Sequence, residues 1–171
     1  QKNHLNTIKA LGKLNKLNSK FEVLEEEIKD VSIAIGHTRW ATHGKVLLEN
    51  THPILSENVA VVHNGIIENH DQIRLELKEK NIVFETTTDT EVIPHLLSTS
   101  MKKTNNFFDS CVSVVAKIEG AYAFAAIHSS NEEIFVARRT SPLVLGIGEG
   151  FNIVGSDAQS ISQIVSTVIY L

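Results

Sequence analysis

The stretch Val59-Ala60-Val61-Val62-His63-Asn64-Gly65 begins with four apolar residues and ends with His-Asn-Gly, a polar end to an apolar strand. Its four consecutive apolar residues predict a fully buried strand over 59–62. A second polar end lies upstream, where His37-Thr38-Arg39-Trp40-Ala41-Thr42-His43-Gly44 follows a half-buried strand predicted over 31–35. Loops at strand ends are where binding groups are usually presented. The two stretches together predict a site for a small molecule that carries a carboxylate.

Outward from these strands, helix-like and strand-like patterns occupy separate parts of the chain. Apolar residues at three- and four-residue steps predict helices over 11–24, 69–80, 90–101 and 108–118. Asn69, in capping-box spacing with Gln72, and Asp157 are predicted N-caps, and Gly120 is a predicted C-cap. Further strands are predicted over 82–84, 121–127, 133–137, 143–147 and 151–154, with a polar connector over 45–57. This order favours an α+β layered fold over a doubly wound one.

The first of these helices carries its basic residues before its acidic ones. That layout opposes the preference of the helix dipole, so we expect packing to hold the helix in place.

Length and composition predict one domain with an ordinary globular core. The chain has 171 residues, of which 42% are hydrophobic and 21% charged. A net charge of −4 gives no electrostatic case for nucleic acid or an anionic membrane as partner. The single cysteine, Cys111, predicts a reducing, cytoplasmic location, and no apolar run is long enough to cross a membrane. The start at Gln1, without Met or a signal peptide, predicts a fragment or a processed form.

Arg39 and Asp89 are the candidate charged ligands of the site. A guanidinium can bind a carboxylate through two parallel hydrogen bonds, although Arg39 could equally form a structural ion pair. Asp89 lies in the cap-rich run 86–90, so it could cap the following helix, bind an ammonium group of the ligand, or do both.

Asn64 and Gly65 have two interpretations. Asn-Gly is a common hairpin turn, but the residues that follow predict a helix rather than a pairing strand. In the alternative interpretation the Asn64 amide and the Gly65 N–H point at one oxygen, and such donors stabilise a tetrahedral intermediate.

The remaining reactive side chains favour structural roles. The histidines show no helical i, i+4 pair and no nearby cysteine, so no metal and no cofactor are expected, and His63 is interpreted as a core histidine. Cys111 lies on an apolar helix stripe and is interpreted as an inert core thiol. Trp40 could be a core residue or a lid over a bound substrate.

Several motifs resemble the glutaminase domain of the glucosamine-6-phosphate synthases, which are class II glutamine amidotransferases also called glutamine–fructose-6-phosphate aminotransferases (isomerising). The resemblance extends over nearly the whole chain and is weakest in residues 1–30. The motifs that carry it are His37–Gly44, His63–His70, Thr88–Glu91, Gly120–Tyr122, Ala137–Leu143 and Ser156-Asp157.

The resemblance implies a four-layer αββα sandwich of the N-terminal-nucleophile hydrolase type. It implies that Arg39 binds the α-carboxylate of glutamine, Asp89 its α-ammonium, and Asn64 with Gly65 the oxyanion. It also implies that the loop 40–43 closes over glutamine, with Thr42 and His43 lining the pocket and Trp40 gating ammonia transfer. The implied partners are glutamine, a sugar isomerase domain of the same parent chain that handles fructose 6-phosphate, and further copies of the chain in a homo-oligomer.

The family's domain begins with Cys-Gly-Ile-Val-Gly, whose cysteine is the nucleophile, and this segment does not occur in the sequence. We therefore expect residues 1–171 to form a glutaminase domain that is incomplete at both ends, lacks the first strand and the isomerase domain, and does not hydrolyse glutamine alone. Strand loss would also leave sheet edges prone to pairing. Two alternatives stay open at this point: a non-catalytic glutamine-binding module, and another class II amidotransferase.

Overall fold

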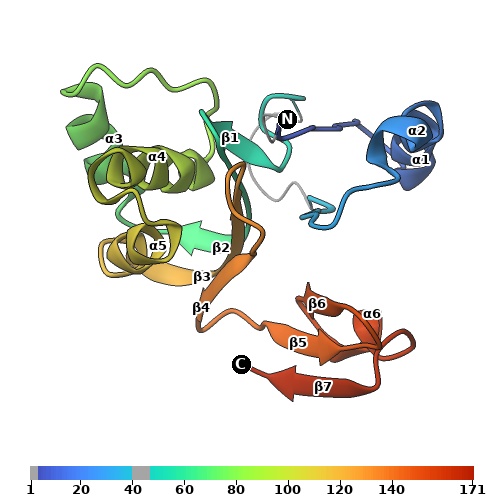
Figure 1. Cartoon of the computed structure of the whole chain (residues 1–171). Helices are drawn as coiled ribbons and strands as arrows, with labels where there is room; N and C mark the ends of the chain where they lie inside the picture. The colour runs from blue at the N-terminus through green and yellow to red at the C-terminus, as the bar shows by residue number, and fades with distance from the viewer. Residues whose placement is uncertain (1–3, 40–46) are drawn as a thin grey trace.

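The structure, a computed structural model, describes residues 4–39 and 47–171 and contains two antiparallel sheets (Figure 1). The larger sheet has the order β1-β2-β3-β4. Its strands are Ile54–Ser56, Val59–Ile67, Gly120–His128 and Phe135–Arg139. The predicted connector over 45–57 thus ends in strand β1, and the strand predicted over 59–62 continues to residue 67 because β3 pairs along its whole length.

Three helices cover one face of this sheet: α3 (His70–Lys78), α4 (Val92–Thr104) and α5 (Phe107–Val115). The 3₁₀ turn η1 (Asp89–Glu91) leads into α4. Apolar residues of β2 and β3 alternate toward the helices, as the period of two of a strand requires. The core that results includes Val59, Val61, Ile67, Ile73, Leu77, Val92, Ile93, Leu97, Phe107, Cys111, Val114, Tyr122 and Phe124.

In the sequence, the helices α3, α4 and α5 lie between strands β2 and β3, which are neighbours in the sheet. Asn69 bridges the two ends of this insertion, which we call its neck. Its side chain donates to the Lys117 carbonyl at 2.9 Å and accepts from the Glu119 N–H at 3.0 Å. It therefore makes no side-chain cap bond to α3, although it occupies the N-cap position. Gly120 is not a C-cap, because α5 ends at Val115 and Gly120 begins β3.

The smaller sheet has the order β6-β5-β7, with β5 (Val144–Ile147), β6 (Asn152–Gly155) and β7 (Thr167–Tyr170). The short helix α6 (Ala158–Ile161) lies on it, and the Asp157 cap is confirmed by an Oδ1 bond from the Ser160 N–H at 2.8 Å. Strand β7 was not predicted. Arg138 joins the two sheets, because its guanidinium donates to the carbonyls of Ser141 and Leu171.

The N-terminal segment contains α1 (Leu14–Val23), which lies within the helix predicted over 11–24, and the short helix α2 (Glu25–Ile28), which follows it and was not predicted. The expectation that packing holds this helix is wrong, because α1 has no buried residue. The strands predicted over 31–35 and 82–84 are also wrong, because these residues form no ladder with any described strand.

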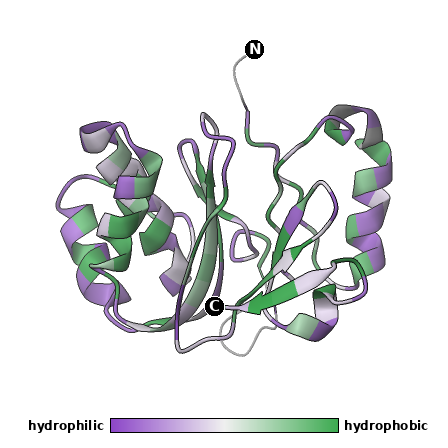
Figure 2. Cartoon of the chain, turned by 60° about the horizontal axis from the view of Figure 1, so that its bottom comes forward, coloured by the Kyte–Doolittle hydropathy of each residue, from purple (hydrophilic) through white to green (hydrophobic). Residues whose placement is uncertain are grey.

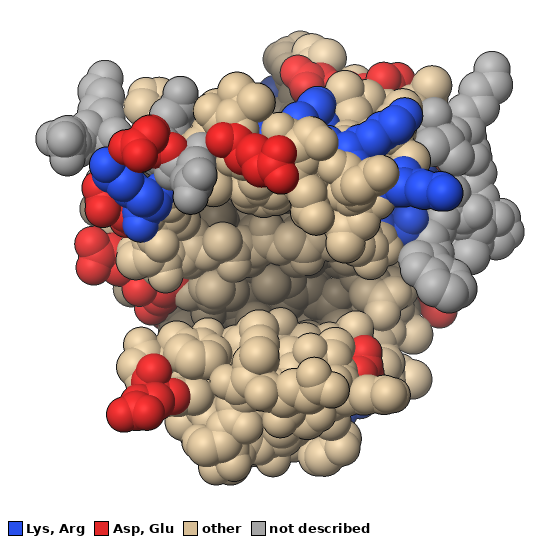
Figure 3. Space-filling view, turned by 90° about the vertical axis from the view of Figure 1, so that its right-hand side faces the viewer, with Lys and Arg blue, Asp and Glu red and all other residues tan. Residues whose placement is uncertain are grey.

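The molecule is an α+β sandwich in which the two sheets face each other with helices outside them (Figure 2). Green, apolar faces of α3–α5 turn toward the larger sheet. A hollow separates the smaller sheet from the rest of the molecule, and its visible walls carry no Lys, Arg, Asp or Glu side chain among the described residues (Figure 3). No helix in the described part of the chain is long and apolar enough to cross a membrane.

Candidate functional site

Asp89 is fixed at the free edge of β2. The β2–β1 pairing ends at Val61, so the backbone beyond it needs another partner on that side. The Ile67 N–H donates to Asp89 Oδ2 at 2.8 Å. Asp89 therefore does not cap a helix: it is the first residue of η1, whose N-cap is Thr88, and the N-cap of the following helix α4 is Glu91. Its half-buried carboxylate retains Oδ1, which this bond does not use.

Glu91 organises the segment that presents Asp89. Its side chain is 2% exposed and accepts from the Glu85 N–H at 2.6 Å, the Thr86 N–H at 2.9 Å and the Thr86 hydroxyl at 2.8 Å. Burial opposes its ionisation, but hydrogen bonds from His95, Glu85 and Thr86 outweigh it and hold the pKa of Glu91 below its usual value.

Arg74 reinforces this segment from α3. It donates to the carbonyls of Thr86 at 3.2 Å and Thr88 at 2.7 Å, and its guanidinium lies 4.1 Å from the centre of the Phe84 ring. Arg74 thus binds carbonyl groups of the threonine run, and Glu91 binds its N–H and hydroxyl groups. Together they fix the backbone that leads into Asp89.

A cluster of histidines meets next to Asp89. The Thr90 hydroxyl lies 2.8 Å from His63 Nδ1 and 3.3 Å from His52 Nε2, and the rings of His52 and His37 are 4.5 Å apart. His63 is buried, as predicted for a core histidine. Its Nε2 has no hydrogen-bond partner in the described ranges 4–39 and 47–171.

The cluster is held in its neutral state. Burial lowers the pKa of His63 to about 4, with Asp89 opposing this shift and His37 adding to it. Burial likewise lowers the pKa of His52 to about 3, helped by the charges of His37, His63 and Arg39. At neutral pH the cluster therefore adds no positive charge beside Arg39 and Asp89.

We expect acid to destabilise the fold through these rings. The unfolded histidines titrate near 6.5, so below that pH the unfolded chain binds more protons, and the free energy of unfolding falls as the pH approaches the folded value. At about 1.4 kcal/mol per pKa unit, His63 alone accounts for roughly 3 kcal/mol. Urea unfolding between about pH 7 and about pH 4 checks this, because His63→Asn should flatten the dependence. Equal slopes in both proteins would refute it.

Arg39 adjoins this cluster at the end of the segment 31–39. It is half-buried, and its charge lowers the pKa of both His37 and His52. The His37 ring, two residues before Arg39, lies against the His52 ring, and Thr90, which follows Asp89, contacts His52 and His63. The segments that carry Arg39 and Asp89 therefore meet at one histidine cluster. The predicted site residues Trp40, Thr42 and His43 lie outside the described residues.

Asn64 and Gly65 lie within β2, so the hairpin interpretation is wrong. They pair with Ala123 and Tyr122 of β3, and both are exposed. Gly65 has φ of +129°, and a Cβ there would lie 2.1 Å from the Ala121 carbonyl oxygen. Asn64 follows His63 directly, and alternation along the strand turns its side chain to the opposite face of the sheet.

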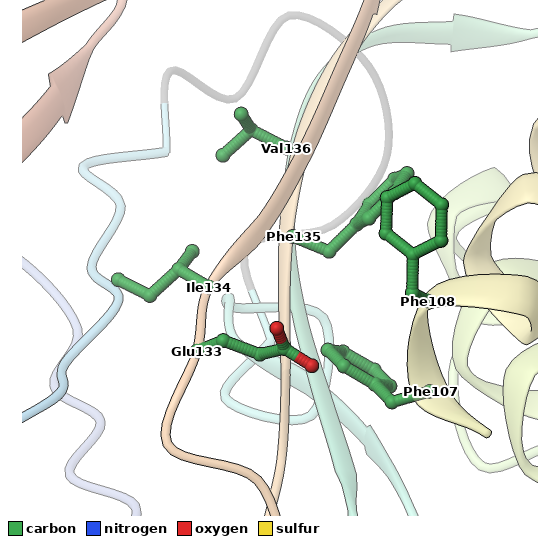
Figure 4. A pocket seen from close by; sticks show the side chains of 6 residues that line it. All are labelled: Phe107, Phe108, Glu133, Ile134, Phe135 and Val136. Atoms are coloured by element: carbon green, nitrogen blue, oxygen red, sulfur yellow. The ribbon is translucent and has the colours of Figure 1, made fainter.

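Two cavities of the described structure lie away from this cluster. One of about 300 Å³ opens where Phe107 and Phe108 of α5 face the start of β4 (Figure 4). Another of about 420 Å³ lies beside Glu68, Glu119 and Arg139. Neither of these two cavities is lined by Arg39 or Asp89.

Metal ligation and thiol chemistry find little support in the described residues. No group of three or more His, Cys, Asp or Glu side chains among them is arranged to hold a metal ion. Cys111 is fully buried, and burial raises its pKa to about 12, which agrees with an inert core thiol.

Sequence reasoning missed Glu91, Arg74, Thr90 and His52. A sequence signal for Thr90 and Glu91 existed, because both belong to the Thr88–Glu91 motif that carries the family resemblance. For Arg74 and His52 no local pattern existed, since their partners lie 14 and 38 residues away.

A family model described as a glutamine amidotransferase domain matches residues 37–163. Glutamine–fructose-6-phosphate aminotransferase [isomerizing] of Idiomarina loihiensis is 43% identical over 171 residues, covering 99% of this chain and 28% of the relative. The protein of the same name from Haemophilus influenzae is 41% identical over 172 residues, covering 100% of this chain and 28% of the relative.

Solved structures agree with this assignment. Glutamine phosphoribosylpyrophosphate amidotransferase from Bacillus subtilis, complexed with ADP and GMP, matches with a TM-score of 0.62 and 29% identity, over 79% of this chain and 29% of that one. A structure described as the allosteric regulatory enzyme of purine biosynthesis matches with a TM-score of 0.65 and 29% identity, over 79% of this chain and 30% of that one.

The chain spans about 28% of the length of the aminotransferases it matches. Their identities of 43% and 41% extend over nearly all of it, and the family model covers its site segments. The chain therefore belongs to the glutamine amidotransferase domain family.

Proposed function

We propose that residues 1–171 form the glutamine-binding part of a glutaminase domain whose parent enzyme converts fructose 6-phosphate to glucosamine 6-phosphate. One observation carries the proposal: the segments that carry the guanidinium of Arg39 and the carboxylate of Asp89 meet at one cluster of partly or fully buried histidines, joined by the His37–His52 ring contact and the contacts of Thr90. Opposite charges held in this way suit the α-carboxylate and α-ammonium of an amino acid.

In this proposal Arg39 binds the α-carboxylate of glutamine and Asp89 its α-ammonium through Oδ1. By resemblance to the family, Asn64 and the Gly65 N–H stabilise the oxyanion that forms at the side-chain amide of glutamine, with the Asn64 side chain on the face of β2 opposite His63. Trp40, Thr42 and His43 belong to the same site by resemblance to the family. Cys111 is not the nucleophile, because its thiol is buried and its pKa is about 12.

The partners of the parent enzyme are part of the proposal. The matched aminotransferases are more than three times as long as this chain, which supports a further domain in the parent enzyme. By resemblance to the family, that domain handles fructose 6-phosphate, and the parent enzyme works in the cytoplasm as a homo-oligomer. The identities of 43% and 41% to these enzymes, against 29% to the purine-pathway structure, favour the amino-sugar reaction over that of another class II amidotransferase.

The test is calorimetric binding of L-glutamine to the chain and to Arg39→Lys. We expect the affinity to fall by about tenfold or more, because an ammonium cannot reproduce two parallel hydrogen bonds. Asp89→Asn keeps an oxygen for the Ile67 N–H but loses the charge, so it should weaken glutamine similarly.

Two analogues serve as matched controls. An analogue without the α-carboxylate should bind Arg39→Lys and the unchanged protein equally, and one without the α-amine should not discriminate Asp89→Asn. Loss of affinity for both analogues in both variants would mean that the substitutions disturb the fold, and unchanged glutamine affinity would remove Arg39 from the site.

A further inference from the structure

Thr90 occupies the point where three segments of the site meet. Its side chain is almost completely buried, at 1% exposure. Its hydroxyl contacts His63 of β2 and His52 of the turn before β1, while its backbone follows Asp89 directly. One hydroxyl thus joins the strand, the turn and the segment that carries the candidate ammonium ligand.

The turn that carries His52 is itself tied to the threonine segment. Asn50 is buried, donates to the Thr87 hydroxyl at 3.1 Å and accepts from the Thr87 N–H at 3.0 Å. The turn over 50–52 is therefore connected to the threonine segment 86–90 at two points, through Asn50 and Thr87 and through His52 and Thr90. The His37 ring lies 4.5 Å from the His52 ring, with the two planes tilted by 38°, and Arg39 follows His37 by two residues.

The hydroxyl also fixes the two rings relative to each other. A threonine hydroxyl has one hydrogen to donate and otherwise accepts. If it donates to one of the two ring nitrogens, the other nitrogen must carry a proton and donate to it. In that arrangement the two neutral histidines hold opposite protonation at the atoms that face Thr90, and the arrangement needs the hydroxyl.

From this geometry we propose that Thr90 is a positioning residue of the amino-acid site, which holds Asp89 and, through His52 and His37, Arg39 at the spacing that a bound α-amino acid requires. The inference rests on the proposed function. It adds that the distance between the two charged ligands is set by a buried hydroxyl that does not itself touch the ligand.

The experiment compares Thr90→Val, Thr90→Ser and the unchanged chain by calorimetry with L-glutamine. Valine keeps the shape and removes the hydroxyl, so we expect about a tenfold loss of affinity, and serine should restore it to within about twofold. Thr99→Val is the matched control, because within residues 4–39 and 47–171 the Thr99 hydroxyl bonds the His95 carbonyl of α4, at 2.8 Å, and no histidine ring of the cluster. It should leave the affinity unchanged.

A second measurement detects the network without ligand. Imidazole ¹⁵N spectra of the unchanged chain should show one protonated and one unprotonated nitrogen at His63 Nδ1 and His52 Nε2, and Thr90→Val should change this pattern, whereas Thr99→Val should not. A merely structural threonine would not move these signals selectively.

Three outcomes would overturn the inference. Equal glutamine affinity in Thr90→Val and the unchanged chain would remove the positioning role while the proposed function stands. Failure of serine to restore binding would show that the hydroxyl is not the cause. If the unchanged chain binds no glutamine at all, the proposed function fails and the positioning role fails with it, a result distinct from the first two.

Discussion

Replacing Gly65 by alanine is expected to destabilise the chain by roughly 3–5 kcal/mol, a large fraction of the roughly 5–15 kcal/mol that stabilises an ordinary protein. The added Cβ would lie 2.1 Å from the Ala121 carbonyl oxygen and 2.8 Å from Tyr122 Cα. Both are backbone atoms of the paired strand β3, so relief requires separating the β2–β3 ladder. The φ of +129° adds strain for any L side chain. Thermal and urea unfolding of Gly65→Ala check the result.

Substitutions at two other glycines separate the two causes of this loss, which are the collision with β3 and the backbone strain from the positive φ. Gly150 has φ of +80°, but no described atom lies within 4 Å of the place that an added Cβ would take, so Gly150→Ala reports backbone strain alone, about 1 kcal/mol. Gly36 has neither a close described neighbour nor a positive φ, so Gly36→Ala should be nearly neutral. A Gly65→Ala protein no less stable than Gly150→Ala would contradict the proposed collision with β3.

Replacing Glu91 by glutamine is expected to cost about 2–4 kcal/mol of unfolding free energy at neutral pH. The carboxylate accepts from the N–H groups of Glu85 and Thr86 with separate oxygens. Glutamine has one oxygen, so its NH₂ group would face one of these donors and leave it unsatisfied in a buried place. Chemical denaturation of the variant measures the loss.

The pH dependence distinguishes this cause from a packing defect. Because the folded pKa of Glu91 lies below the ordinary 4.5, its stabilisation is present above that pH and is lost as the pH falls through the folded value. The gap between the unchanged chain and Glu91→Gln should therefore narrow in acid. Glu85→Gln, at an exposed neighbouring position, is the control and should change stability by less than about 0.5 kcal/mol. A gap that stays constant with pH would point to packing.

The parts of the fold that local patterns encode were predicted well. The strands β2 and β3 and the Asp157 cap follow from residues adjacent in sequence. The α+β class and the family also follow from the sequence, because specific motifs such as His63–His70 carry the resemblance.

The misses share one physical cause, which is competition from partners distant in sequence. Asn69 has the residue type and the position of a cap, yet its side chain bonds Lys117 and Glu119. Asp89 likewise accepts a hydrogen bond from the Ile67 N–H instead of capping a helix. Residues 31–35 alternate like a strand, but a strand exists only where another one pairs with it. The roles of Arg39, Asp89, Asn64 and Gly65 in binding remain predictions.

The closed neck at Asn69 has a kinetic consequence. Strands β2 and β3 are neighbours in the sheet, but Ile67 and Gly120 meet only after the whole intervening chain has turned back on itself. Closing so long a loop costs conformational entropy before the hydrogen bonds of the β2–β3 ladder can form and stabilise the fold, and such non-local pairing slows folding. The helices α3–α5 shorten this loop if they form first, so we expect them to be structured in the folding transition state, with the ladder completed from the neck outward.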